Sequence, residues 1–138
     1  MRFKYLEKIA IADIAFEAYG KNLNEVFENS AYAFFDITCN PNTIKNKIKK
    51  IINIKAENEK DLLYNFLSEL VFLKDSKQLI FNKVNLKIEK NKLKAILFGD
   101  KIDYENQELR NDIKAITLHL FNLEKTKNGY KTRVVVDI

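Results

Sequence analysis

The chain is poor in the residue types that carry the commonest kinds of protein chemistry. Its 138 residues include one cysteine, one histidine and three glycines. The single Cys39 excludes an internal disulfide and a cluster of thiolate metal ligands within one chain, and it suits a reducing cytosol. The glycines are not spaced as in a P-loop or a dinucleotide-binding fingerprint, so a glycine-rich phosphate site is also excluded.

The single histidine and the short apolar runs exclude further classes of function. His119 has no second histidine or suitable cysteine with which to hold zinc or form a nucleophile relay, so we predict a structural or partly exposed side chain. For Cys39 we predict a small buried side chain. No run approaches the roughly 20 apolar residues of a membrane span, and charges interrupt the N-terminal MRFKYLEK. We expect a soluble cytoplasmic protein without a targeting segment, and not an enzyme.

Apolar residues are abundant and the charge is positive. The chain is 46% hydrophobic, with ten Phe and six Tyr, which is enough for the core of one domain over residues 1–138. The net charge is +5 and nearly all basic residues are lysine, whereas dedicated nucleic-acid readers more often use arginine. Genome base composition explains this excess more simply than a ligand does. The densest cluster, KNKIKK at 45–50, could contact phosphate, but a solvated loop or strand start is the commoner role.

The periodicity of apolar residues predicts the secondary structure. Alternation in residues 12–20 predicts a strand that ends at Gly20, and a 3.6-residue period in residues 22–37 predicts a helix capped by Asn22. This helix stops before Pro41. Residues 48–56 form the next predicted strand, and a second helix starts at Asn58 and covers residues 58–73.

The second half of the chain reads as strand after strand. A hairpin turns across residues 90–92, with a kink or bulge near Asn82 and Lys83, and residues 99–112 form a loop. A long strand and the terminal RVVVDI follow. The predicted alternation of the long strand runs through Ile113, Ala115, Thr117, His119, Phe121 and Leu123. Two helices among six or seven largely antiparallel strands predict an α+β fold, with both helices on one face of the sheet.

Two aspartates interrupt otherwise apolar strands. Asp13 lies between Ala12 and Ile14, and Asp137 follows three valines one residue before the end. A strand ordered up to its last residue would hold the carboxylate of Asp137 beside that of Ile138. Hard divalent ions prefer several oxygen ligands. An exposed aspartate on an edge strand is an equally common alternative for each position, but together they favour a shared cation site of Asp13, Asp137 and Ile138.

Over its whole length the chain resembles the archease family, small proteins that work with the RtcB-type tRNA-splicing ligase. The resemblance lies in YLEKIAIADIAFEAYGKNLNEVFENSAYAFFD, DLLYNFLSELVFL, NDIKAITLH and the terminal VVVDI. It implies a metal site made by the first-strand aspartate, the penultimate aspartate and the last residue. These are Asp13, Asp137 and Ile138 here, with Ca²⁺ as the implied ion and Mg²⁺ or Mn²⁺ as alternatives.

The resemblance also implies the role of an accessory protein. Such a protein promotes attachment of GMP to the ligase's active-site histidine and allows repeated turnover in tRNA splicing, with the ligase as partner and tRNA contacted at most indirectly. The chain departs from the family pattern in three places. The stretch KIAIAD is two residues longer than the usual His-Thr-Ala-Asp and lacks its histidine. Asn40 stands where many relatives have an aspartate. Before Asp112, Arg110 and Asn111 replace the residues that are more usual in the family.

Two other functions fit the sequence. One is a basic RNA-binding module that acts as a tRNA chaperone through lysine contacts to phosphate, in which case affinity falls steeply with salt and the two aspartates are irrelevant. The other is a protein-interaction scaffold without metal dependence.

Overall fold

Two α-helices and seven β-strands lie in the part of the chain that the structure describes, which confirms the predicted α+β class. The structure is a computed structural model and describes residues 2–7 and 12–138. The elements are β1 (Phe3–Tyr5), β2 (Asp13–Gly20), α1 (Leu23–Thr38), the 3₁₀ helix η1 (Pro41–Thr43), β3 (Ile48–Lys55), α2 (Glu59–Lys77), β4 (Leu79–Glu89), β5 (Lys92–Lys101), β6 (Ala115–Thr126) and β7 (Gly129–Asp137). Within the described ranges, no helix has the length and apolar character needed to cross a membrane.

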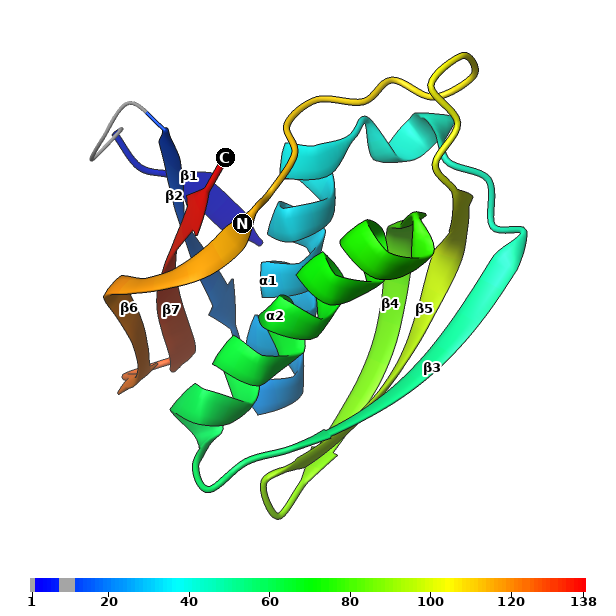
Figure 1. The fold of residues 1–138 in the computed structure, drawn as a ribbon. Helices are drawn as coiled ribbons and strands as arrows, with labels where there is room; N and C mark the ends of the chain where they lie inside the picture. Colours follow the sequence, from blue (N-terminus) through cyan, green and yellow to red (C-terminus); the bar gives the residue numbers. More distant parts are fainter. Residues whose placement is uncertain (1, 8–11) are drawn as a thin grey trace.

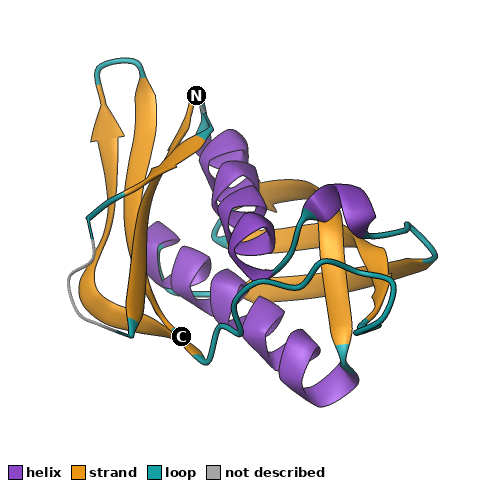
Figure 2. Ribbon diagram, turned by 90° about the horizontal axis from the view of Figure 1, so that it is seen from above, coloured by secondary structure: helices purple, strands orange, loops and turns teal. Residues whose placement is uncertain are grey.

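The strands are divided between two antiparallel sheets, and the helices lie between them (Figures 1 and 2). One sheet has four strands in the order β1-β2-β7-β6, and the other has three in the order β3-β5-β4. Helix α1 contacts β2 and β4, and α2 contacts β6, β3 and β4. The prediction of one sheet with both helices on one face is therefore wrong, although the α+β class is right. Alternation shows that a strand has one buried face but not which sheet the strand joins, so the pattern could not reveal the division.

The helices begin where the sequence predicts. The Asn22 side chain accepts a hydrogen bond from the Glu25 N–H at 2.9 Å, and the Asn58 side chain accepts one from the Asp61 N–H at 2.8 Å. Each cap satisfies one of the free N–H groups of a first helical turn and stabilises its helix by about 1 kcal/mol. Phe27 of α1 and Phe66 of α2, both fully buried, stack with ring centroids 6.2 Å apart. The helices therefore supply the aromatic centre of the core.

Two strands contain irregularities, of which one was predicted. The register of β4 against β5 shifts between Phe81 and Lys83, as the change of parity there indicated. Strand β6 differs from the prediction, because Thr117 pairs with Val135 whereas the next pair is Asn122 with Arg133. Four residues of β6 thus oppose one residue of β7. The continuous alternation predicted from residue 113 to 123 is therefore wrong across this bulge.

The bulge in β6 changes which side chains are buried. Leu118 is 70% exposed and Leu120 is 43% exposed, with Leu120 in the left-handed backbone region at a φ of 57°. The Arg133 Nε donates to the Leu120 carbonyl at 2.9 Å and holds this conformation. His119 is exposed, in agreement with the prediction of a structural or partly exposed side chain.

Candidate functional site

Asp13 and Asp137 face each other at the end of the four-stranded sheet. Asp13 opens β2, Asp137 closes β7, and the two residues are direct partners in the antiparallel register. The Ile138 N–H donates to the Ala12 carbonyl at 2.8 Å, one residue beyond the pair. This pattern makes Asp13 and Asp137 a non-hydrogen-bonded pair, in which the Cα atoms are about 4.5 Å apart and the side chains leave the same face. Both side chains are half-buried.

The third predicted residue is fixed beside this pair. The Ile138 N–H is held by the hydrogen bond to Ala12, and the Ile138 side chain packs against the main core. On the other side of β7, the Asp137 carbonyl accepts a hydrogen bond from the Lys114 N–H at 2.7 Å. The structure therefore brings Asp13, Asp137 and Ile138 together, and the backbone around them is hydrogen-bonded.

The donor set fits a hard cation in part. Two side-chain carboxylates, with a main-chain oxygen of Ile138 beside them, are the kind of oxygen ligands that Ca²⁺ and Mg²⁺ prefer. Within residues 2–7 and 12–138, no three His, Cys, Asp or Glu side chains are grouped so as to hold a metal ion. Because Ca²⁺ takes about six to eight oxygens, these residues would fill only part of its coordination sphere. Water or another molecule would provide the remainder.

The Asn40 side chain caps the 3₁₀ helix η1. Its side-chain oxygen accepts a hydrogen bond from the Asn42 N–H at 3.1 Å and caps η1. This hydrogen bond needs only a side-chain oxygen, which an aspartate also offers, so it does not explain the asparagine at the position where the family often has aspartate. In the stretch KIAIAD, which is two residues longer than the family pattern, residues 8–11 lie outside the described part of the chain.

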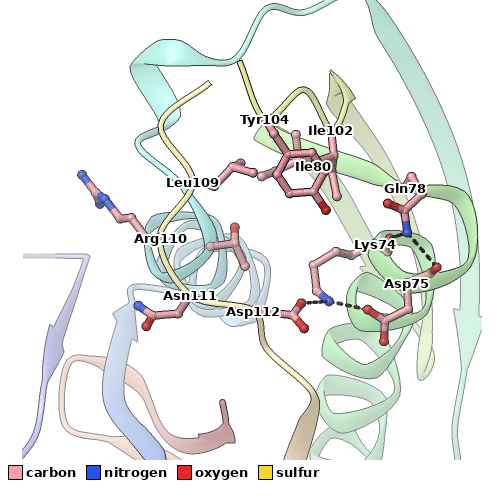
Figure 3. Close-up of a pocket in the computed structure, with 11 residues that line it drawn as sticks. Lys74, Asp75, Gln78, Ile80, Ile102, Tyr104, Leu109, Arg110, Asn111 and Asp112 are labelled. Carbon is pink, nitrogen blue, oxygen red and sulfur yellow. Dashed lines mark hydrogen bonds and ion pairs between the residues drawn. The ribbon is translucent and has the colours of Figure 1, made fainter. Parts of the chain in front are cut away.

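A second polar cluster lies under the loop that joins β5 to β6 (Figure 3). Lys74 of α2 has a side chain only 8% exposed, and its Nζ donates to the Asp112 carboxylate at 2.5 Å and to that of Asp75. In Figure 3 both carboxylates point toward Lys74, whereas Arg110 points away from it. Burial alone lowers the pKa of Lys74, but the hydrogen bonds to Asp112 and Asp75 outweigh it, so the pKa is raised and the ammonium stays charged.

The same loop also donates hydrogen bonds to carbonyls at the C-terminal end of α1. The Arg110 N–H donates to the Thr38 carbonyl at 2.9 Å, and the Asn111 N–H donates to the Ile37 carbonyl at 3.0 Å. These are among the last carbonyls of the helix, which have no partner within it. The Arg110 side chain binds Asp36 at 3.0 Å. Arg110 and Asn111, which depart from the family pattern, therefore attach the loop to α1 through their backbone.

The loop connects the Lys74 cluster to the carboxylate pair. Asp112 binds Lys74, Ile113 is fully buried, and the Lys114 N–H binds the Asp137 carbonyl. Sequence reasoning missed Lys74, although a signal was present: Lys74 follows Leu70 and Val71 at helical spacing, on the buried stripe of α2. A charged residue on an apolar stripe indicates a buried partner.

The remaining candidates have structural roles or separate locations. Cys39 is fully buried, as predicted, and burial raises its pKa to about 11. In the basic cluster, Lys49 and Lys50 are neighbours on β3 and therefore point to opposite faces of the sheet. Lys49 and Lys50 therefore do not belong to one basic face.

Comparison with known proteins agrees with this fold. The model of the Archease protein family matches residues 3–138. A protein archease of Pyrococcus abyssi is 39% identical over 132 residues, covering 92% of this chain and 93% of the relative. A protein archease of Archaeoglobus fulgidus is 36% identical over 141 residues, and the match covers 100% of both chains.

Solved structures have the same fold. A Methanobacterium thermoautotrophicum protein superposes with a TM-score of 0.80 at 30% identity, covering 99% of both chains. A Thermotoga maritima protein, described as an archease and possible chaperone, has a TM-score of 0.69 at 25% identity and covers 98% of this chain and 99% of its own. The agreement of sequence and fold over nearly the whole length leads to one conclusion: the chain belongs to the archease family.

Proposed function

We propose that this protein is a cytoplasmic accessory factor of an RtcB-type tRNA-splicing RNA ligase and not itself the catalyst. It promotes guanylylation of the ligase and multiple turnover through a divalent cation held by Asp13, Asp137 and Ile138. The observation that carries the proposal is the direct pairing of Asp13 with Asp137 across β2 and β7. Membership of the archease family is the reason for proposing the ligase as the partner of this pair.

The arrangement of the pair suits a site that is shared with a partner. Two carboxylates about 4.5 Å apart at the Cα atoms repel each other unless a cation lies between them. The chain supplies few ligands of its own, so a partner can contribute others at the exposed end of the sheet. A bound divalent ion would neutralise charge on the phosphates of GTP as GMP is transferred to the ligase.

The strand register determines what the protein contributes. Asp137 lies on β7 between β2 and β6, and its backbone is fixed on one side by the Ile138–Ala12 hydrogen bond and on the other by Lys114. The backbone that carries the carboxylates is therefore held in position before the partner arrives. Preorganisation of this kind lowers the entropic cost of assembling a reactive geometry.

The direct test is guanylylation of the ligase with radiolabelled GTP, with and without the protein, followed by RNA ligation with substrate in large excess. Wild-type protein should raise both the guanylylated fraction and the number of turnovers. Asp13→Asn and Asp137→Asn, which keep side-chain size, should remove both effects. Asp100→Asn, at a half-buried position in the other sheet, is the matched control and should stimulate like wild type.

The same assay separates the proposal from the RNA-chaperone alternative. If the protein acts only through lysine contacts to RNA, Asp13→Asn and Asp137→Asn should stimulate ligation normally. Guanylylation does not require RNA. If the wild-type protein stimulates this step and the two variants do not, the result counts against the RNA-chaperone function. Equal guanylylation with wild type and both variants would overturn the proposed function.

A further inference from the structure

The outer face of the three-stranded sheet presents lysines in a regular ladder. Both helices lie on one side of this sheet, so the other side is not covered by either (Figure 1). The antiparallel register places twelve outward side chains in four rows across β3, β5 and β4. These rows are Lys49, Phe98 and Lys83; Ile51, Ile96 and Asn85; Asn53, Lys94 and Lys87; and Lys55, Lys92 and Glu89. We call these residues the lysine face.

The lysine face carries the net charge of the whole protein. Its six lysines are all exposed and Glu89 is its one acidic residue, so its formal charge is +5, equal to that of the chain. The other residues of the protein are therefore balanced. In the described part of the chain, none of these six lysines takes part in an ion pair. The face is an uncompensated basic surface.

Sheet stability does not explain this arrangement. Lys87 lies directly opposite Lys94, and Lys55 lies directly opposite Lys92. Like charges in such cross-strand pairs destabilise a sheet. Lysines on edge strands prevent sheets from joining edge to edge, which accounts for those on β3 and β4. Lys92 and Lys94 lie on the central strand β5, where no edge needs protection.

The chemistry of the face matches an anion with repeated charges and flat apolar groups. Alternate lysines on one strand are roughly 7 Å apart. Near the β4–β5 hairpin, a depression is lined by Lys55, Lys87, Lys90, Lys92 and Lys94. At the other end, Phe98 is half-buried beneath Lys83, whose Nζ lies 5.4 Å from the ring centroid.

Apolar side chains continue beside Phe98. Ile51 is 49% exposed and pairs directly with Ile96 in the adjoining row. Single-stranded nucleic acids offer phosphates to lysines and base faces to aromatic or apolar side chains, whereas a duplex keeps its base faces stacked inside. An acidic peptide would match the charge but offers no regular series of flat groups for this apolar row.

We propose that the lysine face binds single-stranded nucleic acid, with backbone phosphates on the lysines and bases over Phe98, Ile96 and Ile51. This binding goes beyond the proposed function, because the face lies across the helices from the sheet that carries Asp13 and Asp137. Metal binding and nucleic-acid binding therefore use separate surfaces.

The test is fluorescence anisotropy with a labelled oligouridylate of about 16 nucleotides. If five lysines contact phosphates, the affinity should fall with a slope of about −3.5 in a plot of log K against log salt. A variant with Lys55, Lys87, Lys92 and Lys94 changed to glutamine should bind at least about tenfold more weakly, with a slope of about −0.7.

A charge-matched control separates this surface from general attraction. Lys21, Lys60, Lys125 and Lys127 are exposed and lie outside the lysine face. Changing these four to glutamine removes the same charge and should change the affinity less than about threefold at equal salt. Equal losses in the two variants, or no binding by wild type, would overturn the proposal.

The single change Lys87→Glu distinguishes a binding role from a structural one. It replaces a like-charge pair with an opposite-charge pair across from Lys94, so the midpoint of thermal unfolding should stay equal or rise. Affinity for the oligouridylate should nevertheless fall. A variant that is more stable and binds equally well would contradict the proposal.

Two further probes test the class of ligand. Polyglutamate of matched charge should displace the oligouridylate poorly, and vesicles containing phosphatidylserine should not retain the protein after sedimentation. Efficient displacement by polyglutamate would assign the face to an acidic protein, and retention by vesicles would assign it to a membrane surface; either would overturn the proposal. The glutamine variant should still stimulate guanylylation without RNA, so the outcome is independent of the proposed function.

Discussion

Asp13 and Asp137 lie directly opposite each other across β2 and β7 in a non-hydrogen-bonded pair. This geometry follows from the strand register and not from a flexible loop. β7 lies between β2 and β6, so a change of register would displace the whole sheet and its buried valines. Substitutions of either carboxylate should therefore act locally.

Removing one carboxylate should weaken cation binding without unfolding the protein. Asp13→Asn and Asp137→Asn should each weaken Ca²⁺ or Mg²⁺ binding at least about tenfold, because a neutral amide replaces a charged ligand. Without cation, the midpoint of thermal unfolding should stay equal or rise, since the repulsion between the carboxylates is relieved. Calorimetric titration and thermal unfolding measure the two effects. Equal binding by wild type and both variants would exclude this pair as a site.

Adding residues after Ile138 should weaken the same cation site. The extension converts the Ile138 carboxylate to an amide, which removes a charged oxygen ligand beside Asp137. The Ile138 N–H bond to Ala12 and the packing of its side chain can persist, so the fold should be unaffected. Calorimetry should show weaker Ca²⁺ binding for a C-terminally extended chain than for an N-terminally extended one. Equal affinities would mean that Ile138 is not a ligand through its carboxylate.

Lys74→Met should loosen the loop more than it destabilises the domain. Methionine fills the buried stem, and the exposed Asp112 and Asp75 carboxylates regain water, so the free energy of unfolding should fall by only about 1 kcal/mol. Hydrogen exchange of the Lys114 amide should quicken, because Asp112 is no longer held. Lys77→Met, at an exposed position of the same helix, is the control. Unchanged exchange at Lys114 would show that Lys74 does not anchor the loop.

The contribution of Lys74 should also depend on pH in a defined direction. Its pKa is raised in the folded protein, so its stabilising effect is complete below the unfolded pKa of about 10.4 and is lost as the pH rises through the higher folded value. The difference in unfolding free energy between wild type and Lys74→Met should therefore be constant from about pH 6 to 9. A difference that disappears within that range would contradict the ion pair.

Cys39 should be unreactive in the native protein. Burial raises the pKa of its thiol to about 11, so it is almost entirely protonated at about pH 8, and its side chain is inaccessible. Ellman's reagent should modify it at least about a hundredfold more slowly in the native state than in concentrated guanidinium chloride. Rapid native modification would mean that the end of α1 opens readily.

Local patterns predicted much of this structure, and the reason is physical. The asparagine caps act through hydrogen bonds to residues three positions away, and the bulge near Lys83 shows as a change of parity within one strand. Asp13 and Asp137 could be grouped because each is a carboxylate within an apolar strand. Their direct pairing supports that grouping of residues, while the bound ion itself stays a prediction.

The features that the sequence did not reveal depend on contacts between distant segments. The division into two sheets depends on which strands pair, and alternation within each strand is the same in either case. The bulge at Leu118 leaves an alternating pattern in the sequence that the backbone does not follow. The role of Lys74 depends on Asp112, which is 38 residues away and belongs to a loop without regular periodicity.

Because the uncompensated charge lies on the outer side of the three-stranded sheet, the centre of charge is displaced from the centre of mass. Near a polyanion the protein should experience a torque that turns the lysine face toward it and leaves the four-stranded sheet on the far side. The molecule would then approach in one preferred orientation before any contact forms, and this orientation would weaken as salt shortens the range of the field.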